Sequence, residues 1–534
     1  MEYYDCDHSL RLLSSAYHET TRFPVVCFSN KIHSCHYLSF RKKQTAKERV
    51  AKRRLSMANP TIVLLPVWGV GHFMPMIEAG KRMVQCSSRA LSLTVLLMPA
   101  PTAQAASDIA GHVRREEGGD IDIRFHHLPH VQLPTDHTGI EEFISRIVQL
   151  HVPRIGAAIS GLTCPVAALV FDIFCTAALD VTRELAVPAY VYFTSSAAML
   201  ALLLRSPTLH GEVEVEFQEM EGAVDVTGLP PVPPSFLPRT MLDRKIPTYT
   251  WFVETGRRYM EADGIIVNTA AELEPGVLAA IADGRCTRGV HAPTVYPIGP
   301  AISISQPAEP RHECVRWLDS QPPASVLFLC FGSKGWLSTS QVQEIAHGLE
   351  RSGHRFLWVL RGLPGDTSHG ARDPRDANLA DVLPEGFLEK TMEIGLVWPQ
   401  RAPQKDILAH ASVGGFVTHC GWNSILESLW FGVPMLPWPL DADQHFNAFA
   451  LVHGMGVAVP LESDRKRDNY VEAAELERAA RSLMGGDDER GKAKEKAMEM
   501  KLVCRNAVEQ GGSSYASLQK LSEKLLGGTV LPKK

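Results

Sequence analysis

An excess of charge of one sign is absent from this sequence, in which 54 Lys and Arg stand against 59 Asp and Glu for a formal net charge of −5. A basic surface of the kind that binds nucleic acid is therefore not expected. Long apolar runs are absent as well, because the nearest candidate, 186–204, is interrupted by Pro188 and by a Thr-Ser-Ser cluster. That run is too broken to span a membrane, and we expect a buried strand followed by a helix there.

A cysteine pattern is also lacking. The eleven cysteines form no CxxC pair and have no regular spacing, which indicates reduced thiols in a cytoplasmic protein. Cys420 is expected to pack as a small residue in a turn rather than to act as a nucleophile. The histidines of FHHLPH, residues 125–130, superficially suggest metal ligands, but no nearby residues complete a site, so we interpret them as loop residues.

The length and the patterning indicate two α/β domains. At 534 residues and 45% hydrophobic composition, the chain is too long for a single core. From Thr61 onward, short apolar strands alternate with helical stretches, which is the rhythm of parallel βαβ units. We expect an N-terminal Rossmann-like domain over 57–304, a C-terminal Rossmann-like domain over 305–508, and a C-terminal helix within 509–534 that packs back on the first domain.

Several segments depart from this rhythm. The Pro-rich stretch 226–242 is predicted to be a surface loop, and the Gly/Asp/Arg-rich stretch 362–378 a loop without a core-forming pattern. Residues 302–313 are interpreted as the linker between the domains. VAVPL, residues 457–461, is expected to extend the second strand series. The charged helices between 472 and 510 carry the polar face of outer helices and are assigned no chemistry.

The stretch 401–444 is the most informative part of the chain. A short apolar segment, FVTH, predicts a buried strand, and a turn leads from it into a helix closed by Gly432. A helix N-terminus behind a glycine-bearing turn presents unpaired N–H groups and the positive end of the helix dipole, which suits a phosphate. Further groups could meet the rest of a ligand: Asn423 and Glu427, which share one helix face, and the pair Asp443 and Gln444, which suits vicinal hydroxyls.

This stretch resembles the secondary-product box of the plant UDP-dependent glycosyltransferases. APQ at 402–404, HCGWNS at 419–424, GVP at 432–434 and the closing Gln444 all fall in register with the box. Along the chain as a whole, the resemblance is to cereal flavonoid O-glucosyltransferases. It implies an α/β protein of the GT-B fold, in which two Rossmann-like domains with parallel sheets face a cleft. It also implies UDP-glucose as donor substrate, with no cofactor and no metal ion.

The first position of the box departs from the family pattern, since Arg401 stands where a Trp usually stacks on uracil. A guanidinium plane can also stack on a base, and it adds cation–π attraction. Trp398 would be an alternative stacking partner only if the end of its strand were remodelled.

The same resemblance divides the donor-binding residues by the part of the UDP-sugar that each meets. The diphosphate is assigned to His419, Asn423 and Ser424, with an added contact from Ser333, and the ribose to Glu427. The sugar is assigned to Trp422, Asp443 and Gln444, and Thr194 to the sugar or the phosphate. Ala402 and Gln404 complete the set with Arg401. The DAD triplet at 441–443 lies at the sugar end of the box and is not interpreted as a metal site.

The expected catalytic pair is also placed by resemblance. A sugar transferase must deprotonate the acceptor hydroxyl, and His72 in GVGHFMP aligns with the general base of the family. An imidazole suits this work because its ordinary pKa lies near neutrality. Asp172, at the end of the predicted strand LVFDIF, aligns with the carboxylate that orients the ring. Asp180, on the following helix, is the weaker candidate for that role.

These assignments predict an inverting UDP-glucose-dependent O-glucosyltransferase that acts on flavonoids or similar small plant phenols as a cytoplasmic monomer. Glucose is expected because Gln444 is the residue type that glucose-using relatives carry. The alternatives are another acceptor such as a terpenoid or a hormone, another donor sugar, or a sugar-nucleotide-binding protein without turnover. A nucleotide-dependent oxidoreductase is discounted because GVGHFMP lacks the third glycine of the dinucleotide fingerprint.

Residues 1–56 are expected to lie outside the fold and to be disordered, since they end in a basic run and show no sustained apolar periodicity. The sequence from Met57 resembles the usual N-terminus of members of this family, so a mis-assigned upstream start codon is the first interpretation. An organelle transit peptide is the second, although acidic residues near the beginning count against it.

Overall fold

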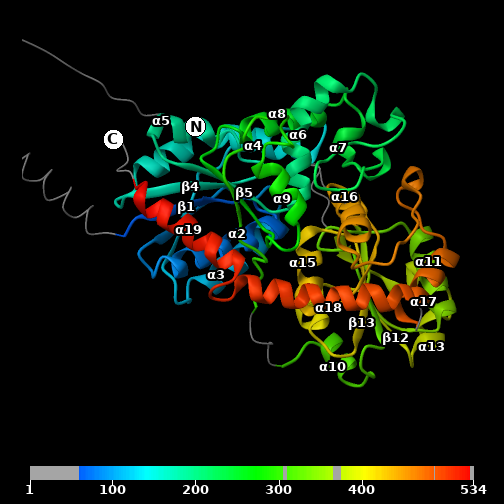
Figure 1. Ribbon diagram of the computed structural model, residues 1–534. Helices are drawn as coiled ribbons and strands as arrows, with labels where there is room; N and C mark the ends of the chain where they lie inside the picture. Colours follow the sequence, from blue (N-terminus) through cyan, green and yellow to red (C-terminus); the bar gives the residue numbers. More distant parts are fainter. Residues whose placement is uncertain (1–58, 305–309, 365–373, 486–487, 530–534) are drawn as a thin grey trace, which may run out of the picture. The chain divides into compact units, whose positions relative to one another are not determined.

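The computed structural model describes residues 59–304, 310–364, 374–485 and 488–529 (Figure 1). The predicted extension 1–56 and part of the predicted linker lie outside these residues. The chain from Ala58 onward belongs to one structural unit that contains two parallel sheets. This agrees with the two α/β halves predicted from the alternation of strands and helices.

The first half is built on a seven-stranded sheet in the order β3-β2-β1-β4-β5-β6-β7, with every neighbouring pair parallel. The order reverses between β1 and β4, so the two strands are neighbours although a long stretch of sequence separates them. Such a switch point opens a crevice at the carboxyl ends of the strands. The strands are β1 Thr61–Leu65, β2 Ser92–Leu97, β3 Ile123–His127, β4 Val166–Asp172, β5 Ala189–Phe193, β6 Gly264–Val267 and β7 Val295–Pro297.

Apolar residues on both faces explain why this sheet is buried between helices. Along β1, Val63 and Leu65 belong to one hydrophobic cluster, and Ile62 and Leu64 belong to another. Successive side chains of a strand point to opposite faces, so a strand buried on both sides is apolar throughout. The helices are α2 Val70–Cys86, α3 Ala103–Glu116, α4 Ile140–Ser160, α5 Ala178–Leu185, α6 Ala197–Glu212, α7 Arg239–Leu242, α8 Pro247–Tyr259 and α9 Pro275–Ala282.

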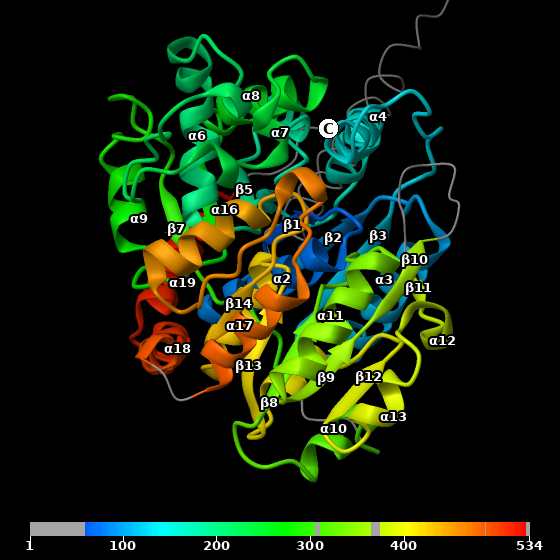
Figure 2. The ribbon, with the colours of Figure 1, turned by 90° about the vertical axis from the view of Figure 1, so that its right-hand side faces the viewer.

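The second half repeats this construction on a five-stranded parallel sheet in the order β12-β9-β8-β13-β14 (Figure 2). The strands are β8 Val326–Cys330, β9 Arg355–Val359, β12 Gly395–Trp398, β13 Val413–Thr418 and β14 Met435–Pro437. The helices are α10 Glu313–Asp319, α11 Thr339–Ser352, α12 Leu379–Val382, α13 Phe387–Thr391, α14 Gln404–Leu408, α15 Trp422–Phe431, α16 Gln444–Phe449 with the π-helix Ala450–Met455, α17 Ala473–Met484 and α18 Asp488–Val508. The predicted strand, turn and helix of the box are therefore β13, residues 419–421 and α15.

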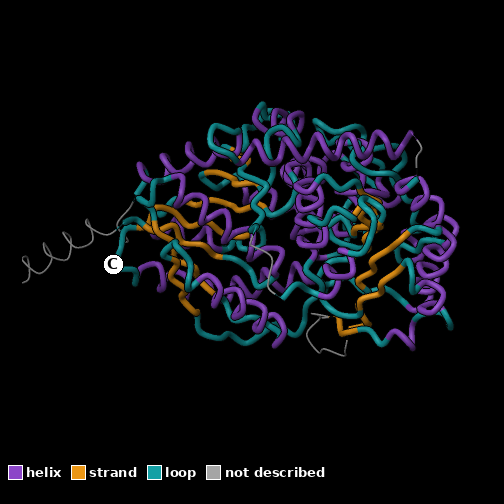
Figure 3. Tube along the Cα trace, turned by 90° about the horizontal axis from the view of Figure 1, so that it is seen from below, coloured by secondary structure: helices purple, strands orange, loops and turns teal. Residues whose placement is uncertain are grey.

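The last helix, α19 Ser513–Gly527, packs on the first half although it follows the second (Figure 1). In Figure 3 the strands of the molecule lie in two groups, each flanked by helices. Its buried face joins the cluster that contains Ile62 and Leu64, and it contacts α2 and β7. Two hydroxyl groups anchor it to backbone carbonyls of the first half. Ser514 Oγ donates to the Gly299 oxygen at 2.7 Å, and Ser522 Oγ donates to the Met83 oxygen at 3.1 Å.

The Pro-rich stretch 226–242 is not the surface loop that the sequence predicted. It contains the 3₁₀-helix Pro234–Phe236 and the helix α7, and the side chains of Val232, Leu237 and Met241 are fully buried. Apolar residues at irregular spacing among prolines pack into the first core without forming a long regular element. Absence of periodicity therefore did not mean exposure in this stretch.

Three smaller expectations also need correction. Residues Arg361–Pro364 and Pro374–Asp376 pair as an antiparallel ribbon, β10 and β11, at the ends of the predicted 362–378 loop. VAVPL adds no strand, because Ala458 makes only an isolated bridge to Met435. His126 and His127 do not lie in a loop. They belong to the edge strand β3, and both side chains are exposed.

The run 186–204 folds as predicted, with β5 followed by α6. Among the described residues, no helix combines the length and the apolar character that crossing a bilayer requires.

The packing of α19 can be tested with two leucines of the same helix. Leu521 is fully buried and Leu526 is 36% exposed. We expect Leu521→Ala to lower the free energy of unfolding by about 2–5 kcal/mol, because it leaves a cavity against the first half. The matched control, Leu526→Ala, should change it by no more than about 0.5 kcal/mol. Urea unfolding followed by circular dichroism measures both, and equal effects would show that α19 is not packed this way.

Candidate active site

His72 and Asp172 meet because their strands are neighbours in the first sheet. His72 lies in the first turn of α2, which follows β1, and Asp172 is the last residue of β4. β1 and β4 pair in parallel, with Leu65 opposite Phe171, so both residues reach the same edge of the sheet. The His72 Nδ1 atom lies 2.8 Å from Asp172 Oδ2. The structure therefore brings together the pair that the resemblance indicated.

The surroundings of this pair determine the protonation of the imidazole. The Asp172 side chain is fully buried, and its Oδ1 accepts from the Phe174 N–H at 3.2 Å. In the neutral ring, Nδ1 donates to the carboxylate and Nε2 keeps a lone pair. Burial opposes protonation of His72, but the charge and hydrogen bond of Asp172, with a smaller contribution from Asp443, raise its pKa above the ordinary value of 6.5. Thr194 Oγ1 stands 3.4 Å from the same Nδ1.

Asp180, the weaker candidate for the orienting carboxylate, pairs with two arginines instead. Its side chain is more than half exposed and makes ion pairs with Arg183 at 3.1 Å and Arg258 at 3.0 Å. The structure therefore leaves Asp172 as the carboxylate that contacts the ring.

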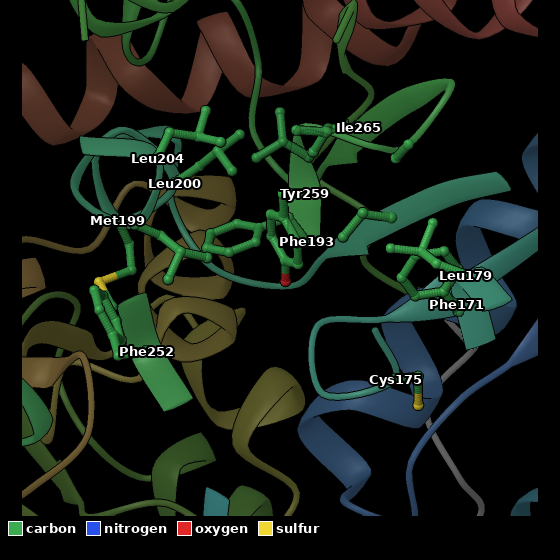
Figure 4. Close-up of a cluster of buried hydrophobic side chains, with 14 of the residues drawn as sticks. Phe171, Cys175, Leu179, Phe193, Met199, Leu200, Leu204, Phe252, Tyr259 and Ile265 are labelled. Atoms are coloured by element: carbon green, nitrogen blue, oxygen red, sulfur yellow. The ribbon is translucent and has the colours of Figure 1, made fainter. Parts of the chain in front are cut away.

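A cavity of about 310 Å³ opens beside the His72 ring. One wall is apolar and comes from the first half. Phe174 lies 5.4 Å from the His72 ring between centroids and stacks on Trp251 at 5.3 Å. Deeper in this wall, Figure 4 shows Met199 beside Phe252 and Phe193 beside Tyr259. The wall also includes Pro238 and Thr240 from the stretch that the sequence assigned to a surface loop.

The opposite wall comes from the second half and is polar. It contains the turn after β8, the turn after β13 and the beginning of α15. The predicted donor-binding residues that line it are Ser333, His419, Trp422, Asn423, Ser424 and Asp443, and Thr194 joins them from the first half. The first helical residues of α15 follow Gly421, which supplies no side-chain cap, so the N–H groups of this described helix remain available for a ligand.

Two glycines allow the His419 ring to pack inside this turn. A Cβ atom on Gly332 would stand 2.6 Å from the ring, and one on Gly421 would stand 2.5 Å from Nε2. Gly332 also has a φ of +76°, which side-chain-bearing residues rarely adopt. Burial lowers the pKa of His419 to about 4, so the ring is neutral near pH 7. Its buried Nδ1 has no hydrogen-bond partner among the described residues.

Two box residues are tied to the first half by hydrogen bonds. Asn423 Nδ2 donates to the Gly71 oxygen at 2.7 Å, next to His72. Trp422 Nε1 donates to the Asn268 oxygen at 2.7 Å, so this N–H is already engaged. Asn268, just after β6, also reaches Asn423 at 3.4 Å. No sequence motif had singled out Asn268.

The sugar end of the box makes further contacts across the cavity. Ser195 Oγ donates to the Asp443 carboxylate, and Asn447 Nδ2 donates to the same carboxylate at 3.0 Å. Burial raises the pKa of Asp443, and these bonds oppose the rise. The side-chain oxygen of Gln444, Oε1, accepts from the backbone N–H groups of Leu440 and Asp441, at 2.9 and 3.0 Å. Ser195 and Asn447 escaped the sequence analysis, although Ser195 directly follows Thr194.

The remaining box residues lie beside the cavity rather than on its wall. Gln404 Nε2 donates to Ser424 Oγ at 2.9 Å and to Glu427 Oε2 at 2.8 Å. Burial raises the pKa of Glu427. Ala402 packs against the core of the second half. Arg401 pairs with Asp108 of α3, and the Trp398 indole meets the His312 ring edge-on, which argues against Trp398 as the stacking partner.

Cys420 is confirmed as a packed turn residue. It is fully buried with a φ of +66°, and its Sγ contacts the Thr418 oxygen at 3.4 Å. Burial raises the pKa of its thiol well above the ordinary value, which disfavours the thiolate that a nucleophile needs.

Comparison with known proteins identifies the family. The model for "UDP-glucoronosyl and UDP-glucosyl transferase" matches residues 304–500. A protein of Oryza sativa subsp. japonica named malvidin galactosylase UGT88C3 is 70% identical over 474 residues, which is 88% of this chain and 98% of the relative. The chain belongs to the plant UDP-glycosyltransferases. An anthocyanidin 5,3-O-glucosyltransferase of a Rosa hybrid cultivar is 37% identical over 88% of this chain and 99% of its own.

Solved structures show the same fold for this UDP-glycosyltransferase. The structure of Phytolacca americana apo UGT2 has a TM-score of 0.77 at 36% identity, and the match covers 88% of this chain and all of that one. The structure of TcCGT1 in complex with UDP has a TM-score of 0.79 at 32% identity, with 88% and 100% covered. The predicted GT-B fold is confirmed: two parallel-sheet domains contribute the two walls of the cavity.

The His72–Asp172 contact predicts a titration that can be measured directly. Asp172 raises the pKa of His72 against the opposing effect of burial. Asp172→Asn removes the charge and leaves the burial, so the pKa should fall from above 6.5 to below it. Proton–carbon NMR of histidine-labelled protein, with His72→Gln used to assign the signal, measures both values. Asp180→Asn is the control and should leave the titration unchanged, and an unchanged titration in Asp172→Asn would contradict the proposed coupling.

Proposed function

We propose that the transferase moves a hexose from a UDP-hexose to a hydroxyl of a flavonoid or a similar flat plant phenol, with inversion at the anomeric carbon. One observation carries this proposal. The His72–Asp172 pair opens onto a cavity that joins an aromatic wall to the uncapped N-terminus of α15.

His72 acts as the general base. Its Nε2 lone pair accepts the proton of the acceptor hydroxyl as the oxygen attacks the anomeric carbon. Asp172 holds the ring in the required tautomer and stabilises the imidazolium that forms. Because the pKa of His72 is raised, the ring becomes a stronger base but is protonated over a wider acidic range. Activity should therefore decline as the pH falls through this raised pKa.

The turn between β13 and α15 binds the diphosphate. N–H groups at the beginning of α15 and the positive end of its dipole would stabilise the charge that develops on the departing UDP. His419, Asn423, Ser424 and Ser333 add side chains to this site. In this scheme, Glu427 binds the ribose hydroxyls while Gln404 holds its carboxylate in place, and Arg401 stacks on the uracil with Ala402 beside it.

The sugar lies between the two domains, where Thr194, Trp422 and Asp443 line the cavity. Gln444 contributes its side-chain NH2 group as donor, because its Oε1 atom already accepts from the N–H groups of Leu440 and Asp441. Direct displacement of UDP from an α-linked sugar in this position gives a β-glycoside.

The acceptor occupies the aromatic wall beside His72. Phe174 and Trp251 form a stacked pair, and flat polyphenols present the complementary face. Relatives support the class: the rice protein is named for malvidin and the Rosa protein for anthocyanidins. One solved relative, Phytolacca americana UGT2, is complexed with UDP-2fluoro-glucose and pterostilbene, and matches at 35% identity with a TM-score of 0.75.

Glucose and galactose are both candidates for the transferred hexose. Gln444 favours glucose by resemblance, and the names of several relatives include glucosyltransferase. Galactose is the second candidate because the relative with 70% identity is named a galactosylase. The two sugars differ only in the orientation of the hydroxyl at C4.

We also propose that the protein works as a monomer in the cytoplasm without nucleic acid. The near-balanced charge and the scattered cysteines support this setting. Light scattering of the purified protein and the location of a fluorescent fusion test the two parts.

A screen of donors against acceptors tests the function as a whole. UDP-glucose, UDP-galactose and UDP-glucuronate are each paired with flavonols, anthocyanidins, simple phenols, diterpenes and cytokinins, and products are identified by mass. We expect flavonoid hexosides, with kcat/KM for UDP-glucose above that for UDP-galactose. The reverse order would establish the second candidate. A terpenoid or hormone that exceeds every flavonoid tenfold in kcat/KM would contradict the proposed acceptor class.

Removal of the base tests the mechanism. His72→Ala should lower kcat on the order of hundreds-fold, because attack then proceeds without general-base assistance. Asp172→Asn should lower it as well, through misorientation of the ring. UDP affinity, measured by calorimetry, should change little in either variant. Retention of more than about a tenth of wild-type turnover by His72→Ala would contradict its role as base.

A further inference from the structure

The position at which the box departs from its family is held by a residue of the other domain. Arg401 Nη1 lies 3.0 Å from both Asp108 Oδ1 and Asp108 Oδ2. Asp108 belongs to α3 and is 293 residues away in sequence. The acceptor-side domain therefore contacts the donor box at the residue that replaces the stacking Trp.

Asp108 is itself fixed in place. Gln104, one turn earlier on α3, donates its Nε2 to Asp108 Oδ1 at 2.9 Å. The carboxylate side chain is only 17% exposed, whereas the Arg401 side chain keeps 45% of its surface exposed. The aspartate is thus the anchored partner, and the arginine retains surface that a ligand can cover.

The neighbouring His112 does not carry a charge that would compete for Asp108. His112 follows Asp108 by one turn, but burial, together with Arg115, Lys405 and Arg401, lowers its pKa to about 4. His112 is therefore neutral near pH 7 and does not compete with Arg401 for the carboxylate.

The pair is poorly suited to a purely stabilising role. Ion pairs with an exposed arginine contribute little to folding, because solvent screens them and two long side chains must be ordered. Their geometric effect is larger, since an anchored carboxylate restricts the positions that the guanidinium can occupy. An unrestrained arginine has far more rotamer freedom than the flat indole it replaces.

We propose that Asp108 is a positioning residue for UDP: it holds the Arg401 guanidinium over the uracil and so restores the preorganisation that a tryptophan would have. This rests on the proposed function, since it takes the box as the UDP site. Asp108 does not touch the ligand and acts only through Arg401. The base subsite is therefore completed by α3 of the first domain.

A double-mutant cycle tests this role. Calorimetry gives the Kd of UDP for the wild type, Asp108→Asn, Arg401→Trp and the double variant. Asp108→Asn should weaken UDP binding about three- to tenfold in the wild-type background. In the Arg401→Trp background the same change should have less than about a twofold effect, because an indole needs no carboxylate. Tighter binding of UDP by Asp108→Asn, or equal losses in both backgrounds, would overturn the proposal.

Two controls separate positioning from structure and from the proposed function. Asp122→Asn breaks the pair of Asp122 with Arg124, whose arginine is 49% exposed, and should leave the Kd of UDP unchanged. Inorganic pyrophosphate, which has no base, should bind the wild type and Asp108→Asn equally, and an equal loss for both ligands would contradict a role at the base. A wild type that does not bind UDP would contradict the proposed function itself. If UDP binds and the cycle is additive, only the role of Asp108 fails.

Discussion

The hydrogen bond between His72 and Asp172 depends on one topological fact, the adjacency of β1 and β4 in the first sheet. The strand order reverses at this pair, so the segments that follow them diverge and leave a crevice at their carboxyl ends. The carboxylate enters the crevice from the end of a fully buried strand, where water cannot compete for it. The imidazole enters from the first turn of a helix, where it is partly exposed to the cavity. The fold thus accounts both for the buried carboxylate of Asp172, which accepts the hydrogen bond, and for the partly exposed imidazole of His72.

The second domain provides the complementary charge by the same architectural rule. After β13, the His419 ring packs against Gly421 of its own turn and Gly332 of the turn after β8, and α15 begins without a side-chain cap. A helix that capped its own N–H groups would have no donors left for a phosphate. The parallel sheets therefore place His72, the proposed base, and the proposed phosphate site on opposite walls of one cavity, as a displacement reaction requires.

The sequence predicted the parts of this site that depend on local pattern or motif. The alternation of strands and helices indicated both sheets, and the box indicated the turn at 419–421 and the helix closed by Gly432. The sequence pattern did not predict contacts between segments that are distant in the chain. Asn268, Asn447 and Asp108 each make a hydrogen bond or an ion pair to a residue far away in the sequence, Asn423, Ser196 and Arg401 respectively, and such contacts leave no periodicity. The prediction of a surface loop over 226–242 was wrong for a related reason. The buried residues of this stretch are spaced by prolines rather than by a helical or strand period.

The contacts that join the two domains at the cavity are mostly polar. Asn423 bonds to Gly71, Trp422 to Asn268, and Asp443 to Ser195, and Arg401 pairs with Asp108. The large apolar clusters instead lie mainly within one domain or the other. A hydrogen bond contributes little net free energy, about 0.5–1.5 kcal/mol, because water or a ligand can replace either partner. Bonds of this kind can be exchanged when UDP-sugar and acceptor enter, whereas a continuous apolar core would resist the exchange. For that reason, several residues that connect the domains are also residues that the substrates would contact.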